Sequence, residues 1–150
     1  MTADRPTVPH LQRPAVQLLI VAVLAAGLVL GLDAITNSLD ISTYAWDFIH
    51  YIDMAENGVA GNPGLVAPYA YRPIPSLLAG VFADVTGRTT LLGFRLIAWA
   101  GVWAELVLAF ALARQFTRRF WGALAVMLIV GISTFNARFY VFDPFRPDPL

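Results

Sequence analysis

The chain has 150 residues, of which 58% are hydrophobic and 13% charged, and its ten basic residues, all arginine, balance ten acidic ones. A soluble globular domain has about 25% charged and about 45–50% apolar residues, so this composition predicts an integral membrane protein and excludes a disordered chain. The zero net charge provides no field that attracts a polyanion, so we expect no nucleic-acid partner. The absence of cysteine excludes disulfides, thiolate metal sites and a cysteine nucleophile.

The N-terminal third of the chain predicts a polar tail and a first membrane span. Residues 1–13 form a cytoplasmic tail with two arginines, and residues 14–32 contain one polar side chain, Gln17. Nineteen helical residues cover about 28 Å, close to the ~30 Å hydrocarbon core. A cleaved signal peptide is the alternative, but the apolar block exceeds a usual h-region and no small-residue cleavage site follows it. Asp33 is interpreted as a plain stop at the interface.

Residues 33–92 form a long loop with six acidic residues and only two arginines. Over residues 44–57, apolar side chains recur at spacings of four, four and three while polar ones occupy another face, which predicts an amphipathic interfacial helix closed by Gly58. Residues 74–85 are apolar but too short to cross a membrane alone, so we expect a second interfacial or re-entrant helix that ends at Gly87.

Two more apolar stretches, residues 93–113 and 120–137, predict a second and a third transmembrane helix. The connection between them, residues 114–119, contains three arginines and is therefore expected on the cytoplasmic side. Loop 33–92 and the tail 138–150 are then extracytoplasmic. The expected fold is an all-α polytopic membrane protein with three transmembrane helices, the last two of which are antiparallel neighbours.

One ionisable residue, Glu105, lies near the middle of the second predicted span. A charge at mid-span costs about 2.5–3.5 kcal/mol on insertion scales, so this side chain should face protein or water. Two roles stay open for it: a functional intramembrane group, as in a transporter, or a buried hydrogen bond to another helix.

Two short motifs stand in the outer loop. WDFIHYIDMAENG places Asp47, Tyr51 and Ala55 at successive spacings of four, and APYAYRPIPSLLAG contains an RP…P element that begins at Arg72. With the apolar helix and the arginine turn that follow, the chain from about residue 15 to residue 150 resembles the N-terminal region of bacterial polytopic glycosyltransferases of the GT-C type.

The resemblance implies a glycosyltransferase that takes a sugar from a polyprenyl-phosphate donor on the extracytoplasmic face of a bacterial inner (plasma) membrane. By position, Asp47 takes the role of catalytic base in the first outer loop. Members of that superfamily have about eight to thirteen spans. We therefore expect this chain to be an N-terminal fragment, with a fourth span missing after residue 150, and to be inactive by itself.

Other residues near these motifs are candidate ligands. Tyr51, Tyr69, Tyr71 and Arg72 are candidates for substrate binding, since an arginine can hold a phosphate bidentately and tyrosines can stack on a sugar. Anchoring at the lipid headgroups is the alternative for the last three. Asp47 and His50 are weak candidates for a Mg²⁺ or Mn²⁺ site, against which stands a plain solvated helix face.

Two classes of function follow from these observations. The first is the N-terminal part of a membrane glycosyltransferase with a lipid-linked sugar donor as its partner. The second is a small non-catalytic integral membrane protein, such as a packing subunit, or an inactive truncated remnant. The lipid bilayer is a partner in both classes.

Overall fold

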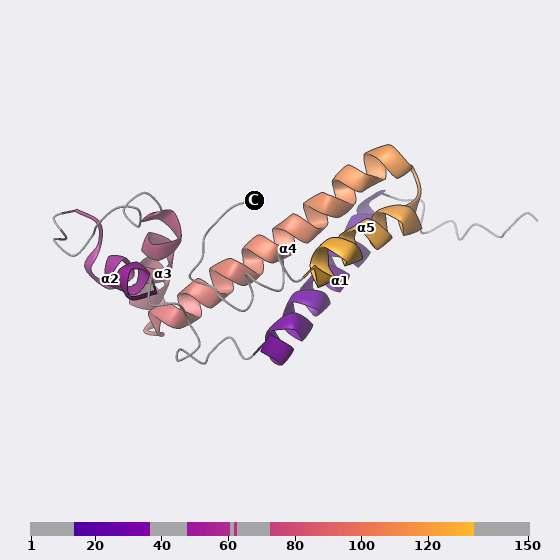
Figure 1. Cartoon of the computed structure of the whole chain (residues 1–150). Helices are drawn as coiled ribbons and strands as arrows, with labels where there is room; N and C mark the ends of the chain where they lie inside the picture. Colours follow the sequence, from indigo (N-terminus) through magenta and orange to yellow (C-terminus); the bar gives the residue numbers. More distant parts are fainter. Residues whose placement is uncertain (1–13, 37–47, 61, 63–72, 134–150) are drawn as a thin grey trace, which may run out of the picture.

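The structure is a computed structural model that describes residues 14–36, 48–60, 62 and 73–133, and within these ranges it contains five helices and no strand. The predicted all-α fold class is therefore confirmed for this part of the chain. The helices, shown in Figure 1, are α1 (Pro14–Thr36), α2 (Phe48–Asn57), α3 (Pro73–Thr86), α4 (Thr90–Thr117) and α5 (Phe120–Ile132).

The helices α1 and α4 are long and apolar enough to cross a membrane, by length and composition. Only 28% of the most apolar stretch of α1 and 22% of that of α4 are buried inside the protein. Large apolar side chains such as Leu19 and Leu108 are about two-thirds exposed, at 66% and 67%. Such an outward-facing apolar surface is unfavourable in water and is expected where the surrounding solvent is hydrocarbon.

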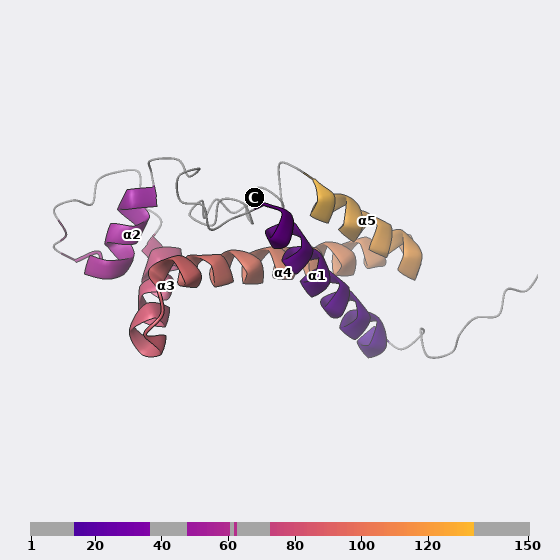
Figure 2. The same ribbon diagram turned by 90° about the horizontal axis from the view of Figure 1, so that it is seen from below.

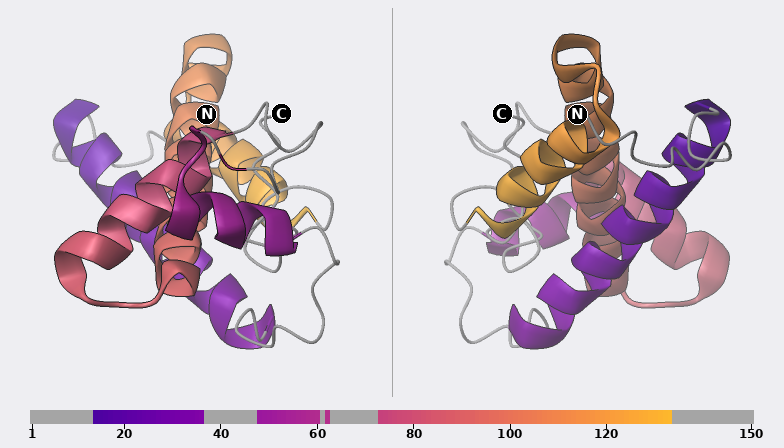
Figure 3. Two further views of the ribbon diagram at one scale, coloured as in Figure 1. Left: turned by 90° about the vertical axis from the view of Figure 1, so that its left-hand side faces the viewer. Right: turned by 90° about the vertical axis from the view of Figure 1, so that its right-hand side faces the viewer.

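A first core is formed where α1, α4 and α5 meet. Figures 2 and 3 show α1 crossing α4 obliquely while α5 runs back beside the C-terminal half of α4. Each helix contributes one buried stripe at helical spacing, because every third or fourth residue faces the same side. The buried residues are Val21, Ala25, Val29 and Leu32 from α1, Val102, Leu106, Phe110 and Ala113 from α4, and Ala123, Leu124 and Met127 from α5.

The turn between α4 and α5 brings the two helices together as antiparallel neighbours, as predicted. Arg118 adopts a left-handed conformation with φ 52°, and its backbone N–H donates to the carbonyl of Arg114 at 3.1 Å. Phe120 then packs edge-on against Phe110, with ring centroids 5.6 Å apart. The connection consists of Arg118 and Arg119, because α4 continues as far as Thr117.

A second core lies at the other end of α4, where α2 and α3 pack on its first turns. It contains Tyr51, Met54, Ala79 and Phe94. Figure 2 shows α3 lying crosswise to α4 at this end. Glycine makes the close approach possible: a Cβ on Gly80 would stand 2.1 Å from the backbone oxygen of Ala55, and one on Gly93 would stand 2.9 Å from backbone atoms of Ala79.

Several predicted boundaries differ from the observed ones. The helix α1 continues past the predicted range 14–32 to Thr36, and α4 exceeds the range 93–113 at both ends. At its start, the side chain of Thr89 accepts a hydrogen bond from the backbone N–H of Leu92, which caps the helix three residues early.

The predicted third span, residues 120–137, begins where α5 begins, but α5 ends at Ile132 because Ser133 turns to an extended conformation. Residues 134–137 lie outside the described part of the chain. With 13 residues, α5 covers about 20 Å, less than the ~30 Å hydrocarbon core. The described helices long enough to cross a membrane are therefore α1 and α4.

The helices α2 and α3 lie where the sequence predicts two short helices, residues 44–57 and 74–85, and their position at a membrane interface stays a prediction. The helix α2 ends before Gly58, whose φ of 76° lets its N–H donate to the carbonyl of Met54 at 3.1 Å. The helix α3 ends before Gly87, which has φ 66°. The sequence predicts Gly58 as the C′ residue of α2 and Gly87 as the end of α3, and both glycines adopt a left-handed conformation. Residues 44–47 of the first predicted helix lie outside the described residues.

Candidate functional site

Four of the predicted site residues lie outside the described part of the chain, so their roles stay predictions. They are Asp47, Tyr69, Tyr71 and Arg72. The described candidates are His50 and Tyr51 on α2 and Glu105 on α4.

The side chain of Tyr51 is 7% exposed and packs in the second core with Met54 and Phe94. Ala55, one turn later, packs against the same core and faces Gly80. The four-residue spacing of the sequence motif therefore coincides with the packed face of α2. His50 is half-buried beside Tyr51. The described residues contain no group of three or more His, Asp or Glu side chains that could hold a metal ion.

Glu105 is half-buried near the middle of α4. It lies between Val102 and Leu106, both buried in the first core, so it borders the packed stripe of the helix. This position is compatible with the expectation that a carboxyl in the middle of a span faces protein or water. A catalytic or transport role for Glu105 stays a prediction.

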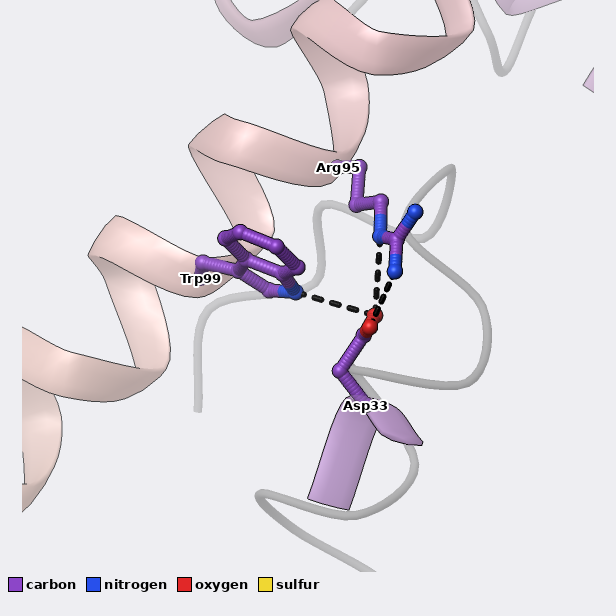
Figure 4. Close-up of polar contacts among 3 residues, drawn as sticks. All are labelled: Asp33, Arg95 and Trp99. Atoms are coloured by element: carbon purple, nitrogen blue, oxygen red, sulfur yellow. Dashed lines mark hydrogen bonds and ion pairs between the residues drawn. The ribbon is translucent and has the colours of Figure 1, made fainter. Parts of the chain in front are cut away.

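A polar cluster that sequence reasoning missed joins the end of α1 to the start of α4 (Figure 4). The carboxylate of Asp33 is paired with the guanidinium of Arg95, whose Nε donates to Oδ1 at 2.8 Å and whose Nη2 donates to Oδ2. The indole Nε1 of Trp99 donates to the same Oδ1 at 3.1 Å, and the guanidinium carbon of Arg95 lies 4.8 Å from the Trp99 ring centroid.

This cluster corrects the interpretation of Asp33 as a plain interface stop. Its side chain is 9% exposed and that of Arg95 is 17% exposed, so the pair is largely removed from solvent. Paired in this way, the carboxylate does not end the helix, and α1 continues one turn further. One signal for this pair was present in the sequence. When two long helices are antiparallel, the end of the first lies near the start of the second, and the oppositely charged Asp33 and Arg95 stand at these two places.

Two contacts hold α1 against α4 elsewhere. The guanidinium of Arg114 donates from Nε to Oε1 of Gln17 at 3.3 Å, which joins the start of α1 to the end of α4. Along the crossing, the indole of Trp103 donates to the backbone oxygen of Ala22 at 2.9 Å. The two helices are thus connected by polar contacts at both ends.

A further carboxylate organises the exit from α2. Asp53 accepts hydrogen bonds from the side-chain amides of Asn62, at 2.7 Å, and Asn57, at 2.8 Å. These donors, first Asn62 and then Asn57, together with the charge of His50, hold the pKa of Asp53 below its ordinary value. Asn62 also donates to the carbonyl of Gly58 at 3.3 Å, so Asp53 and Asn62 close the turn after α2.

An open cleft of about 460 Å³ lies between α2, the end of α3 and the start of α4. Its charged lining residues are Glu56, Asp84 and Arg88. The hydroxyl of Thr90 donates to Oε1 of Glu56 at 3.4 Å across the cleft. The sequence predicted no site here, because the three charged residues come from separate elements and share no motif.

The comparisons with known proteins assign no family: no protein-family model, no curated protein and no solved structure matches this chain.

Proposed function

We propose that the chain is an integral membrane protein in which α1 and α4 cross the bilayer in opposite directions. The support is the spacing of the polar contacts. From Gln17 to Asp33 the helix α1 rises about 24 Å, and from Arg95 to Arg114 the helix α4 rises about 28 Å. Both lengths approach the ~30 Å thickness of the hydrocarbon core, so the two polar contacts mark its two surfaces.

The arginines give the direction of crossing. Arg114, Arg118 and Arg119 gather at one end of α4, and the N-terminal tail of the chain belongs to the same side. Under the positive-inside rule this side is cytoplasmic, and the α2–α3 corner is extracytoplasmic. A third crossing by residues 120–137 and a bacterial inner-membrane location complete the proposal.

The helix α3 then lies in the membrane interface. It runs crosswise to α4, and its outer face carries an exposed apolar stripe at helical spacing. A helix of 14 residues is too short to cross, so such a stripe is stabilised by lying on the acyl region of the bilayer. The stripe consists of Ile74, Leu77, Leu78, Val81 and Val85.

The activity we propose is transfer of a sugar from a polyprenyl-phosphate donor at this outer surface, by the GT-C type enzyme of which the chain is the N-terminal part. One observation supports it above the others: Tyr51 and Ala55 share the packed face of α2. In the sequence, Asp47 stands four positions before Tyr51, as Ala55 stands four positions after it, and Asp47 lies outside the described residues.

The chemistry assigned to Asp47 is general-base catalysis. Its carboxylate takes the proton of an acceptor hydroxyl while that oxygen forms a bond to the anomeric carbon of the donor sugar. The bond between the anomeric carbon and the phosphate oxygen breaks, and polyprenyl phosphate leaves with the electron pair. A nearby carboxylate stabilises the positive charge that develops on the sugar in the transition state.

The test compares Asp47→Asn with Asp53→Asn in membranes that contain the complete gene product. Transfer of a labelled sugar from a polyprenyl-phosphate donor should fall by at least about 10²-fold in Asp47→Asn and persist in Asp53→Asn, because loss of a general base costs about 10²–10⁴-fold. Equal amounts of both variants in the membrane fraction control for expression. Full activity of Asp47→Asn removes this residue from the mechanism.

Absence of transfer from the unaltered protein, with correct insertion, would favour the non-catalytic alternative. In that case the membrane placement stands and the enzyme assignment falls.

A further inference from the structure

We propose that the cleft between α2, α3 and α4 binds the zwitterionic headgroup of an ethanolamine phospholipid, which carries a phosphate and a primary ammonium. The inference rests on the membrane placement proposed above but not on the transferase activity. It is argued from the charges that line the cleft, the elements that bring them together and the apolar face beside it.

The cleft presents unpaired charges of both signs. Asp84 on α3 and Arg88 after it are exposed, and within the described residues neither side chain has an ion-pair or hydrogen-bond partner. They stand four positions apart and line the same cleft without forming a salt bridge with each other. Exposed charges of opposite sign that line one cleft are complementary to a ligand that carries both.

The phosphate matches the side of the cleft formed by Arg88 and the start of α4. A guanidinium binds a phosphate with charge-assisted hydrogen bonds, and the start of a helix carries a partial positive charge, although Thr89 already accepts from the N–H of Leu92 in the first turn of α4. Thr89 and Thr90, at the start of α4, also line the cleft. An arginine and a 28-residue helix thus favour an anion at the same place.

The ammonium matches the carboxylates of Asp84 and Glu56, which also line the cleft, Glu56 next to Thr90 at the start of α4. A primary ammonium has three N–H donors and can bond to both carboxylates, whereas the quaternary ammonium of a choline headgroup has none. A glycerol headgroup has no ammonium to neutralise the two carboxylates, so its phosphate would be repelled by them. The lining therefore discriminates among the three common headgroups.

Size and position agree with a lipid ligand. A volume of about 460 Å³ is within the ~300–1,000 Å³ of small-molecule sites. Gly87 lines the cleft, and even a Cβ at this position would have no atom within 4 Å, so the cleft is open here. On α3, Val81 and Val85 flank Asp84 and are 59% and 80% exposed, so acyl chains of a bound lipid would continue along the apolar stripe.

The experiment uses the full chain in nanodiscs made from equal parts of phosphatidylethanolamine, phosphatidylcholine and phosphatidylglycerol. The protein is extracted in mild detergent, and the co-purified lipids are quantified by mass spectrometry. We expect about fivefold enrichment of the ethanolamine lipid over each of the others, consistent with a few charge-assisted hydrogen bonds. Arg88→Ala should abolish the enrichment, and the matched variant Arg118→Ala, at the far end of α4, should retain it.

The double variant Glu56→Gln/Asp84→Asn tests the recognition of the ammonium separately from that of the phosphate. It removes both carboxylates and keeps Arg88, so it should abolish the preference for phosphatidylethanolamine over phosphatidylcholine. Soluble glycerophosphoethanolamine identifies the source of the ligand: its displacement of the lipid supports a site for the headgroup itself. Equal retention of all three lipids, or equal loss in Arg88→Ala and Arg118→Ala, would overturn the proposal. Binding of the soluble compound without lipid enrichment would overturn its assignment to a lipid.

Discussion

The two cores of this molecule share α4 but are built from different contacts. The α1–α4–α5 core is filled by large side chains such as Leu106, Phe110 and Met127 and is closed at its ends by polar contacts. The α2–α3 corner brings backbones together at Gly80 and Gly93. The first core should therefore be most sensitive to loss of a charge partner, and the second to the gain of a single methyl group.

The largest effect is expected from Asp33→Ala. Removal of the carboxylate leaves Arg95 largely buried without its counter-ion, which should lower the free energy of unfolding by about 3 kcal/mol. The measurement is equilibrium unfolding in detergent micelles. The double variant Asp33→Leu/Arg95→Leu is the control and should recover most of the loss, because no buried charge remains. If Asp33→Ala unfolds like the unaltered chain, the pair does not hold α1 to α4.

Gly80→Ala should lower the free energy of unfolding by about 2 kcal/mol. The new methyl would meet the backbone oxygen of Ala55 at 2.1 Å and force α2 away from α3. Gly101→Ala on α4 is a matched control, since a Cβ there has no atom within 4 Å. Because alanine favours a helix over glycine, the control should be neutral or stabilising by up to about 1 kcal/mol. Equal behaviour of the two variants in thermal unfolding would argue against close packing at the corner.

Trp103→Phe should lower the free energy of unfolding by about 1 kcal/mol. This change removes the indole hydrogen bond to the backbone oxygen of Ala22 and keeps most of the aromatic surface. Trp121→Phe makes the same chemical change on α5, where the side chain is 71% exposed. Trp103→Phe should destabilise the chain more than Trp121→Phe. The reverse order would mean that the contact with α1 contributes nothing.

The smallest effect concerns pH. Hydrogen bonds from Asn62 and Asn57 lower the pKa of Asp53 in the folded chain. These hydrogen bonds therefore stabilise the folded chain fully above the unfolded aspartate pKa of about 3.9, and this stabilisation is lost as the pH falls through the lower pKa of the folded chain. The NMR signal of the Asn62 side-chain amide should titrate with a midpoint below about 3.9. Asp84→Asn should leave this titration unchanged and Asp53→Asn should remove it. A midpoint at or above the ordinary value contradicts the hydrogen-bond arrangement.

Much of the fold could be predicted from local sequence signals. Long apolar stretches predicted the positions of α1 and α4, and Gly58 and Gly87 correctly predicted the ends of α2 and α3. These signals act within a few residues: a capping side chain stabilises the start of a helix, and glycine favours the left-handed conformation after its end. The exact ends of α1 and α4 depend on contacts such as Asp33 with Arg95, which join residues far apart in the sequence.

The site was harder to predict for the same reason. Asp33 carries no motif, and its role depends on how α1 crosses α4. The cleft depends on Glu56, Asp84 and Arg88 coming together from separate elements. A motif can select Asp47 as a candidate, but the contacts that would test that candidate lie outside the described residues.

The most direct test of the membrane placement is sided labelling of single cysteines, since the chain has none of its own. Ala60→Cys lies just after α2 and Gln115→Cys in the last turn of α4, and both positions are exposed. In intact cells, a membrane-impermeant maleimide should label Ala60→Cys and should label Gln115→Cys only after the membrane is opened. Labelling of both positions in intact cells, or of neither, would contradict a chain that crosses the bilayer between them.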